Sequence, residues 1–445
     1  MAYTSLLDRL GLHRRELRAW ALYDVANSAW MTTVMTAVFP LFFVKVAASG
    51  LAPEVARSRF FFASSLSVIL VGLLGPLLGA IADYRGSKKL FLGAFVGLGA
   101  AATGAMYFIV DGQWGFALAT FVVGNVAVTS SLAFYNSLLP SIASADEVDR
   151  VSTAGFALGY LGGGALLALN MAMLGNPQRF GIPDGSTAAR LSLLSVAVWW
   201  VLFSIPLFRQ VPEPARRLEA SETGGESAIR IAARRLAGTF RELRVHKDAG
   251  LLLLAFLVYN DAVNTIIRAA TTYGDEIGIS SAHLMLALLM IQVVGVPFAF
   301  AFGALADRIG ARRAIFVALA VYSVVSIYGF TLRTTTQFFA LGFLVATVQG
   351  GVQALSRSLF ATLIPRHKAG ELFGFFGVFD RFGGSMGTFV FGIMLATTGS
   401  SRPAILTLII FFAIGAWLLT RVDMERGRRV AREAEAAAHE AATTA

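Results

Sequence analysis

The chain contains a near repeat of part of its own sequence. Residues 79–89 read GAIADYRGSKK, and residues 303–313 read GALADRIGARR, 224 residues further along a chain of 445. In each copy an apolar segment ends at an Asp, a Gly follows three residues later, and a basic pair comes next. A repeat at half-chain spacing predicts a fold built from a duplicated unit.

Composition places the duplicated unit in a membrane. Hydrophobic residues make up 56% of the chain, charged residues 14%, and the mean hydropathy is +0.68. A soluble protein of this length could not bury so much apolar surface. Twelve segments are long enough to cross about 30 Å of hydrocarbon as helices. They cover residues 17–47, 59–82, 90–110, 114–140, 152–174, 191–209, 249–273, 284–306, 314–332, 337–364, 372–398 and 403–421.

The twelve spans divide equally between the two halves of the chain. We therefore expect an all-α membrane protein whose twelve transmembrane helices form two six-helix bundles related by a pseudo-twofold axis. The expected parts are an N-terminal bundle, a cytoplasmic connector, a C-terminal bundle and a cytoplasmic tail, covering 1–211, 212–248, 249–424 and 425–445. The connector pattern predicts an amphipathic helix on the inner leaflet, with a docking site for another protein as the alternative. We expect the tail to form a short solvated helix and assign it no function.

Basic residues orient the chain. With the N-terminus inside, 27 Lys and Arg fall in inner segments and 7 in outer loops, so both termini are expected in the cytoplasm. The net charge of +10 is then explained by anchors that face anionic lipid, and no nucleic-acid partner is expected. The N-terminal segment shows no cleavage site typical of a signal peptide. We expect a monomer, integral to the bacterial cytoplasmic (inner) membrane.

Ionisable residues inside the spans are the strongest indication of function. Each would cost about 2.5–3.5 kcal/mol at a helix centre that faced lipid, so we expect these side chains to face partners or water. Three are acids and three are bases, so internal ion pairing is one interpretation, and a lined solute path is the other. The six are Asp24, Asp261, Arg268, Arg357, Asp380 and Arg381.

Polar residues recur at helical spacing near these charges. The first and seventh spans each carry an Asp and an Asn three residues apart, on one helix face. The tenth span carries a Gln and an Arg four residues apart, which also share a face. These pairs are Asp24 with Asn27, Asp261 with Asn264, and Gln353 with Arg357.

Two resemblances to known families follow from these motifs. The repeated loop at 79–89 and 303–313 closely resembles the cytoplasmic signature loop of the major facilitator superfamily of membrane transporters. The string WALYDVANSAW at 20–30, with YND at 259–261 and QALSRS at 353–358, resembles the vacuole-effluxer-like permeases, which are related to fungal autophagy-associated amino-acid exporters. The resemblance covers most of the twelve spans.

The family resemblance implies a central cavity lined by the first, fourth, seventh and tenth helices, and release of amino acids or similar small solutes. It implies a substrate path along Asp24, Asn27, Asp261, Asn264, Arg268, Gln353 and Arg357. Proton coupling needs a carboxylate whose proton affinity depends on which side is open. Asp261 is the main candidate because it is the deepest acid, and Asp24 and Asp380 are further candidates.

The signature loops are predicted to act in gating. Each Asp can pair with nearby cations, or with the positive end of a neighbouring helix, when the inner side is closed. The alternative is that these residues only cap helix ends. In the first loop Tyr84 follows the Asp and the Arg is displaced by one position, which leaves its detailed contact open. The predicted gating residues are Asp83, Arg85, Gly86, Asp307, Arg308, Gly310 and Arg312.

We therefore expect a secondary active transporter that moves a small polar solute, such as an amino acid or another zwitterion, by alternating access, with protons as the coupling ion. We expect no enzyme activity, cofactor or metal site, because no convergent set of His, Ser and carboxylates is visible and the chain has no Cys. Two alternatives remain open. One is a lipid or lysolipid facilitator with apolar lateral clefts, and the other is a receptor on the same fold that binds solute without transport.

Overall fold

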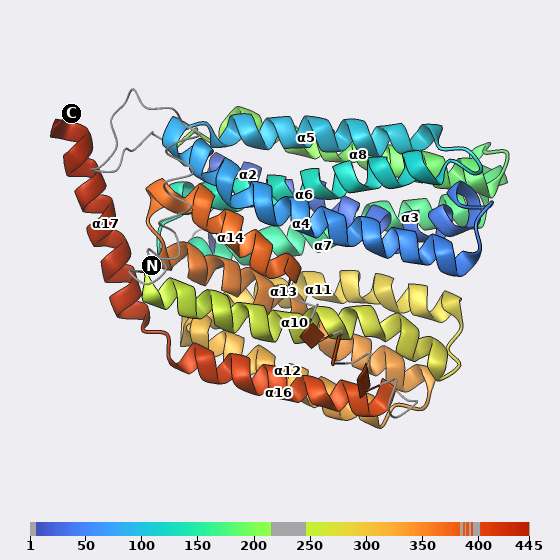
Figure 1. Ribbon diagram of the computed structural model, residues 1–445. Coiled ribbons are helices and arrows are strands. Elements are labelled where there is room, and N and C mark those ends of the chain that lie inside the picture. The colour runs from blue at the N-terminus through green and yellow to red at the C-terminus, as the bar shows by residue number, and fades with distance from the viewer. Residues whose placement is uncertain are drawn as a thin grey trace.

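The computed structural model describes residues 6–214, 246–382, 386–387, 389–390, 393–394 and 401–444. These residues form long helices that run side by side along one direction (Figure 1). The helices of the first half are α1 (Leu6–Arg9), α2 (Arg15–Ala29), η1 (Trp30–Ala37), α3 (Phe39–Phe42), η2 (Phe43–Ala47), α4 (Pro53–Arg85), α5 (Lys88–Ala105), η3 (Met106–Phe108), α6 (Trp114–Ile142), α7 (Val148–Gly175), η4 (Pro177–Phe180) and α8 (Gly185–Gln210). Those of the second half are α10 (Lys247–Glu276), α11 (Ser281–Ile309), α12 (Ala311–Phe330), α13 (Thr335–Leu363), η5 (Arg366–Lys368), α14 (Ala369–Phe382), α16 (Ser401–Thr420) and α17 (Met424–Thr444).

Eleven helices within the described residues are long and apolar enough to cross a membrane. They coincide with eleven of the twelve predicted spans to within about two helical turns. Helices are the expected form because a backbone in hydrocarbon must satisfy its own hydrogen bonds. The twelfth predicted span, 372–398, begins as α14, and most of its remainder lies outside the described residues, as does the predicted connector helix.

The first span changes its winding partway along. After α2 it continues as the π-helix η1, then α3 and η2, so a single 33-residue span holds four segments. The Val38 amide donates to the Thr33 carbonyl, five residues back, at 2.8 Å. Pro40 follows at the start of α3 and has no amide hydrogen to donate, which explains why regular α-helical bonding is interrupted here.

The two halves of the chain pack as two bodies with both termini at the same end. In Figure 1 the blue-to-green half lies above the yellow-to-red half, and the N and C labels lie at one end. The halves meet chiefly where α7 packs on α11 and where α4 packs on α14. These are the fifth span on the eighth and the second on the eleventh, which a pseudo-twofold axis exchanges. The predicted two-bundle fold is confirmed.

The backbone conformation explains why each of the two signature loops contains a glycine. Gly86 ends α4 with a φ of +63°, and Gly310 separates α11 from α12 with a φ of +87°. Residues with a Cβ rarely adopt this left-handed region, so Gly is favoured at both turns. The turn explains why each copy of the repeat has Gly three residues after its Asp.

Basic residues of each loop cap the last membrane span of their own half. Lys89 Nζ donates to the Phe208 and Val211 carbonyls, at 2.9 and 2.6 Å, where α8 ends. Arg312 donates to the Val422 and Thr420 carbonyls, at 3.0 and 3.2 Å, where α16 ends. Arg312 was predicted among the gating residues, and the contacts observed for it lie within one half.

The tail forms the 21-residue helix α17, which extends along the end of the molecule that holds the termini (Figure 1). Arg426 forms two hydrogen bonds with the Asp248 carboxylate of α10, both 2.7 Å long. About halfway along α17, Glu435 Oε1 accepts from the Arg366 amide at 2.9 Å. The tail is thus bound to α10 and to η5, the segment that precedes α14.

The cap formed by Arg312 gives a test of the fold. Arg312→Ala removes two hydrogen bonds from a charged donor and should lower the stability of the protein by about 1–2 kcal/mol. The measurement is the melting temperature in detergent. Arg313→Ala is the matched control, because Arg313 is the exposed neighbour. Equal melting temperatures for the two variants would contradict the capping role.

Candidate functional site

A buried ion pair joins the two halves. Asp24 on α2 and Arg357 on α13 are 5% and 3% exposed. Both Nη atoms of Arg357 lie 3.2 Å from Asp24 Oδ2. A charge removed from water needs a partner of this kind, because leaving either charge unpaired would be strongly unfavourable.

Three more side chains satisfy the pair. The Tyr135 hydroxyl on α6 donates to Asp24 Oδ2 at 2.9 Å. On α7, Ser152 accepts twice: Arg357 Nε donates to its Oγ at 2.9 Å and Nη2 to its carbonyl at 2.8 Å. Arg357 Nη1 also lies 3.4 Å from the Asn136 amide oxygen. The guanidinium is therefore bound on several edges, which holds it in one orientation.

Aromatic rings surround the same guanidinium. Its central carbon lies 4.5 Å from the ring centroid of Phe156, 4.8 Å from that of Trp20 and 5.7 Å from that of Tyr135. Such distances allow cation–π attraction. We call the residues that enclose the guanidinium the aromatic box, and they are Trp20, Asp24, Tyr135, Ser152 and Phe156.

Helical spacing explains how the aromatic box is assembled. Trp20 and Asp24 lie four residues apart on α2, and Ser152 and Phe156 lie four apart on α7, so each pair shares a helix face. The sequence motif contained Trp20 and Asp24, but Ser152 and Phe156 were missed. One serine and one phenylalanine at a helix start are common in packed cores, and four-residue spacing alone gives little signal.

The other predicted acids lie elsewhere. Asp261 is fully buried on α10, and its Oδ2 accepts from the Gly387 amide of the eleventh span. Its neighbour Asn260 donates to Asp380 Oδ1 at 2.8 Å. These contacts join the seventh and eleventh spans within the second half. Among the described contacts, they form a cluster separate from the Asp24–Arg357 pair.

The remaining predicted path residues differ in their surroundings. Asn27 is 6% exposed, and within the described residues its amide oxygen is buried without a hydrogen-bond partner. Asn264 and Gln353 are half-buried on α10 and α13. The side chain of Arg268 lies outside the described set. An unsatisfied amide oxygen one turn from Asp24 is an acceptor available to water or solute.

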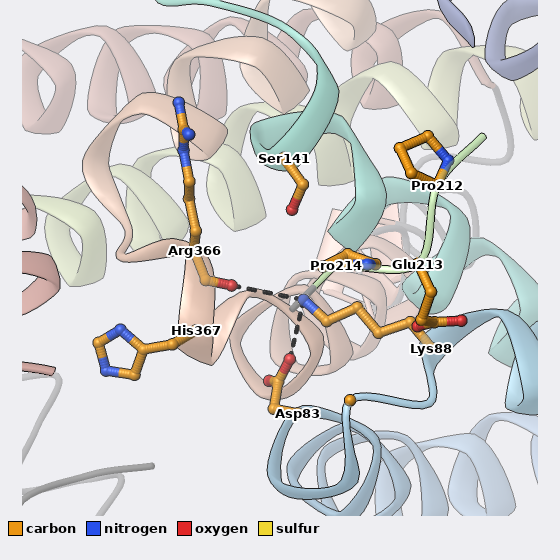
Figure 2. Close-up of a pocket in the computed structure, with 9 residues that line it drawn as sticks. Asp83, Lys88, Ser141, Pro212, Glu213, Pro214, Arg366 and His367 are labelled. Carbon is orange, nitrogen blue, oxygen red and sulfur yellow. Dashed lines mark hydrogen bonds and ion pairs between the residues drawn. The ribbon is translucent and has the colours of Figure 1, made fainter. Parts of the chain in front are cut away.

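The first signature loop forms a contact across the halves. Asp83 is buried, and its carboxylate pairs with Lys88 Nζ at 2.9 Å (Figure 2). The same carboxylate accepts from the Gly370 amide at 3.0 Å and from the Glu371 amide at 2.8 Å. Those amides belong to the first turn of α14, where helix N-termini attract negative charge. Lys88 Nζ also lies 3.4 Å from the Arg366 carbonyl.

The second signature loop makes the symmetry-related contact. Arg150 Nε at the start of α7 donates to Asp307 Oδ2 at the end of α11, at 2.5 Å. Arg85 and Arg308 are exposed. We call the Asp83 and Asp307 contacts the two latches. Arg150 was missed, because the sequence gives no indication of which cation the second Asp meets.

A pocket of about 260 Å³ lies beside the first latch. Asp83, Lys88, Glu213, Arg366 and His367 are among its lining residues (Figure 2). The Glu213 carboxylate accepts from the amide at the start of α5, at 3.0 Å. Burial raises the pKa of Glu213, and the hydrogen bonds from α5 partly oppose that rise. Charged side chains from both halves of the chain line the pocket, which lies at the end of the molecule that holds the termini.

The first latch predicts a measurable change in access. Asp83→Asn weakens charge-assisted bonds to α14 and should raise the population of the opened end about tenfold. Because the chain has no Cys, Thr153→Cys can report this change: Thr153 is 1% exposed and lies against Gly303 of α11. Labelling of this thiol by a maleimide should become correspondingly faster. Asp146→Asn, at an exposed site near the same end, should leave the labelling rate unchanged. Equal rates in both backgrounds would contradict the latch.

Close packing at the ion pair predicts a second effect. A Cβ at Gly155 would collide with Asp24 Oδ2 and would lie 3.2 Å from Arg357 Nη2. Gly155→Ala should therefore lower stability by about 1–3 kcal/mol, read as a lower melting temperature. Gly97→Ala is the control, because a Cβ there meets nothing within 4 Å and Ala favours a helix. If Gly155→Ala has the same melting temperature as the wild type, the described packing around the ion pair is wrong.

Comparison with known proteins assigns the chain to a family. A family model described as "Vacuole effluxer Atg22 like" matches residues 12–432. The uncharacterized MFS-type transporter YxiO of Bacillus subtilis is 36% identical over 421 residues, which is 94% of this chain and 97% of that protein. Autophagy-related protein 22 of Kluyveromyces lactis is 23% identical and covers 94% of this chain and 96% of its own length.

Solved structures share the fold at low sequence identity. The human organic anion transporter MFSD10 (TETRAN) has a TM-score of 0.69 at 15% identity, covering 91% of this chain and 99% of that chain. The proton:xylose symporter XylE has a TM-score of 0.67 at 12% identity, covering 92% and 95%. At such identities the likeness concerns the fold alone, whereas the family model and the YxiO match span nearly the whole sequence. The chain is therefore a membrane protein of the major facilitator fold and belongs to the Atg22-like vacuole-effluxer family of transporters.

Proposed function

We propose that this protein is a monomeric secondary transporter that moves a small zwitterionic solute, such as an amino acid, across the bacterial cytoplasmic membrane by alternating access. Both termini lie in the cytoplasm and protons are the coupling ion. The observation that carries the proposal is the buried Asp24–Arg357 pair, which offers both signs of charge at one place between the two halves.

Alternating access requires contacts that form and break between the halves. The Asp24–Arg357 pair and the two latches each join a helix of one half to a helix of the other. All three lie toward the end that holds the termini, so opening that end breaks them together. The desolvation cost of a buried ion pair offsets much of its attraction. Such pairs can therefore open at moderate cost, which suits a reversible gate.

A zwitterion can replace the partners that separate. Its ammonium group matches Asp24 and its carboxylate matches Arg357, so solute binding would compensate both charges as the pair opens. The unsatisfied amide oxygen of Asn27, one turn from Asp24, adds a hydrogen-bond acceptor. The family description as vacuole effluxers supports release of the solute as the physiological direction.

Proton coupling is assigned first to Asp261. Its carboxylate is fully buried and lies in the second half, apart from the Asp24–Arg357 pair. Movement of the second half against the first would change the hydration of this carboxylate, and hydration sets proton affinity. Asp24 and Asp380 are the further candidates, since each carboxylate accepts a hydrogen bond from a neighbouring helix.

Transport in liposomes tests the two assignments separately. Arg357→Gln should reduce counterflow of an amino acid at least about tenfold, because the solute carboxylate loses its charged partner. Asp261→Asn should keep counterflow, which needs no net proton movement, and should lose accumulation driven by a pH gradient. Asp111→Asn, in an outer loop, is the control for reconstitution.

Each outcome of this experiment decides one point. Full counterflow by Arg357→Gln would refute the solute anchor, and full gradient-driven accumulation by Asp261→Asn would refute the proton site. Saturable solute binding by the wild type without any counterflow would indicate a receptor. Counterflow of lysolipids in place of amino acids would indicate a lipid facilitator.

A further inference from the structure

The surroundings of Arg357 point to a more specific role for the residues that enclose it. We propose that the aromatic box is the binding site for the cationic group of the transported solute, and that the Arg357 guanidinium occupies this site while the end with the termini is closed. This inference rests on the proposed transport function and names the chemical group that the site takes.

The box and its occupant belong to different halves of the molecule. Trp20 and Asp24 lie on α2, Tyr135 on α6, and Ser152 and Phe156 on α7, all in the first half. Arg357 lies on α13, in the second half. Separation of the halves at this end therefore withdraws the guanidinium and leaves every wall of the box on one rigid body.

Two of the walls, Trp20 and Tyr135, are held by contacts that do not involve Arg357. The Trp20 indole donates to the Tyr135 carbonyl at 3.0 Å, and the two rings stack with centroids 4.4 Å apart. Tyr23 packs against Tyr135 and donates to Ser131 at 2.8 Å, and Trp200 donates to the Tyr23 hydroxyl at 3.3 Å. These contacts all lie within the first half, so the Trp20–Tyr135 side of the emptied box should keep its shape. The Ser152 hydroxyl donates to the Ala354 carbonyl of α13 at 2.7 Å, and separation of the halves frees it for the solute.

The chemistry of the emptied box selects cations that carry N–H groups. The Asp24 carboxylate supplies a full negative charge, and the Ser152 carbonyl and hydroxyl oxygens accept the Nη2 and Nε hydrogens in the closed state. Trp20 and Phe156 present aromatic faces, which favour a cation further. A primary ammonium or a guanidinium satisfies all of these groups, whereas a neutral amide leaves the carboxylate uncompensated.

A binding experiment tests the box without any transport. Arg357→Ala removes the side chain beyond Cβ, and ethylguanidinium restores those atoms as a free molecule. Purified full-length Arg357→Ala protein in detergent should be stabilised saturably by ethylguanidinium and by ethylammonium, as followed by melting temperature. Ethylurea, the neutral analogue, should have no such effect. Adding Asp24→Asn should weaken binding of both cations at least about tenfold, which is about 1.4 kcal/mol.

A second variant covers the case in which Arg357→Ala does not fold. Asp83→Asn combined with Asp307→Asn weakens both latches and keeps Arg357, so the box should become accessible at the opened end. Ethylguanidinium should then stabilise this protein more than the wild type, and Asp24→Asn should abolish the difference. No saturable shift with either cation, an equal shift with ethylurea, or a shift that survives Asp24→Asn would overturn the proposal.

The outcome is distinguishable from failure of the transport proposal. If the cations bind as predicted but the protein catalyses no counterflow, the cation site is supported and the transporter proposal is refuted. If the protein catalyses amino-acid counterflow but neither variant binds a cation, the transporter proposal is supported and the cation site is refuted.

Discussion

A buried charge inside a membrane protein needs an opposite charge or a set of polar groups, and that requirement organises this structure. Asp24 and Asp83 are almost wholly buried. Asp24 pairs with Arg357 of the opposite half, whereas Asp83 pairs with Lys88 of its own half and accepts from two backbone amides of the opposite half. Asp307 also pairs with the opposite half, at the surface. Because these contacts join the two bodies, charge compensation as well as packing holds the bodies together at this end. The proposed alternating access would require these contacts to be exchanged for others as the halves separate.

The fold could be predicted well from the sequence because it depends on local features, namely the length of apolar segments and the residues at turns. Apolar length fixed the spans, and the repeat of Gly86 at Gly310 marked turns that need a positive φ. The pairing within the spans was less predictable. Three acids and three bases allowed many pairs, and only the packing of α2, α6, α7 and α13 brings Asp24 to Arg357. Asp261 shares its motif with Asp24, yet it lies against the eleventh span.

Residues that were missed share a physical reason. Ser152 contributes two acceptors, one of them a backbone carbonyl that any residue type would supply. Phe156 contributes a ring face, and phenylalanine is abundant in this chain. Arg312 was predicted among the gating residues, and its guanidinium donates to two carbonyls at the end of α16. Such assignments depend on which helix end lies within reach of a long side chain, and tertiary packing alone decides that.

The position of α17 has a consequence for control from the aqueous side. Glu435 binds the amide of Arg366, the carbonyl of Arg366 faces Lys88, and Lys88 pairs with Asp83. A continuous line of polar contacts thus leads from a water-exposed tail to a buried carboxylate. A displacement of α17 would therefore be transmitted to Asp83 through contacts at the end of the molecule that holds the termini.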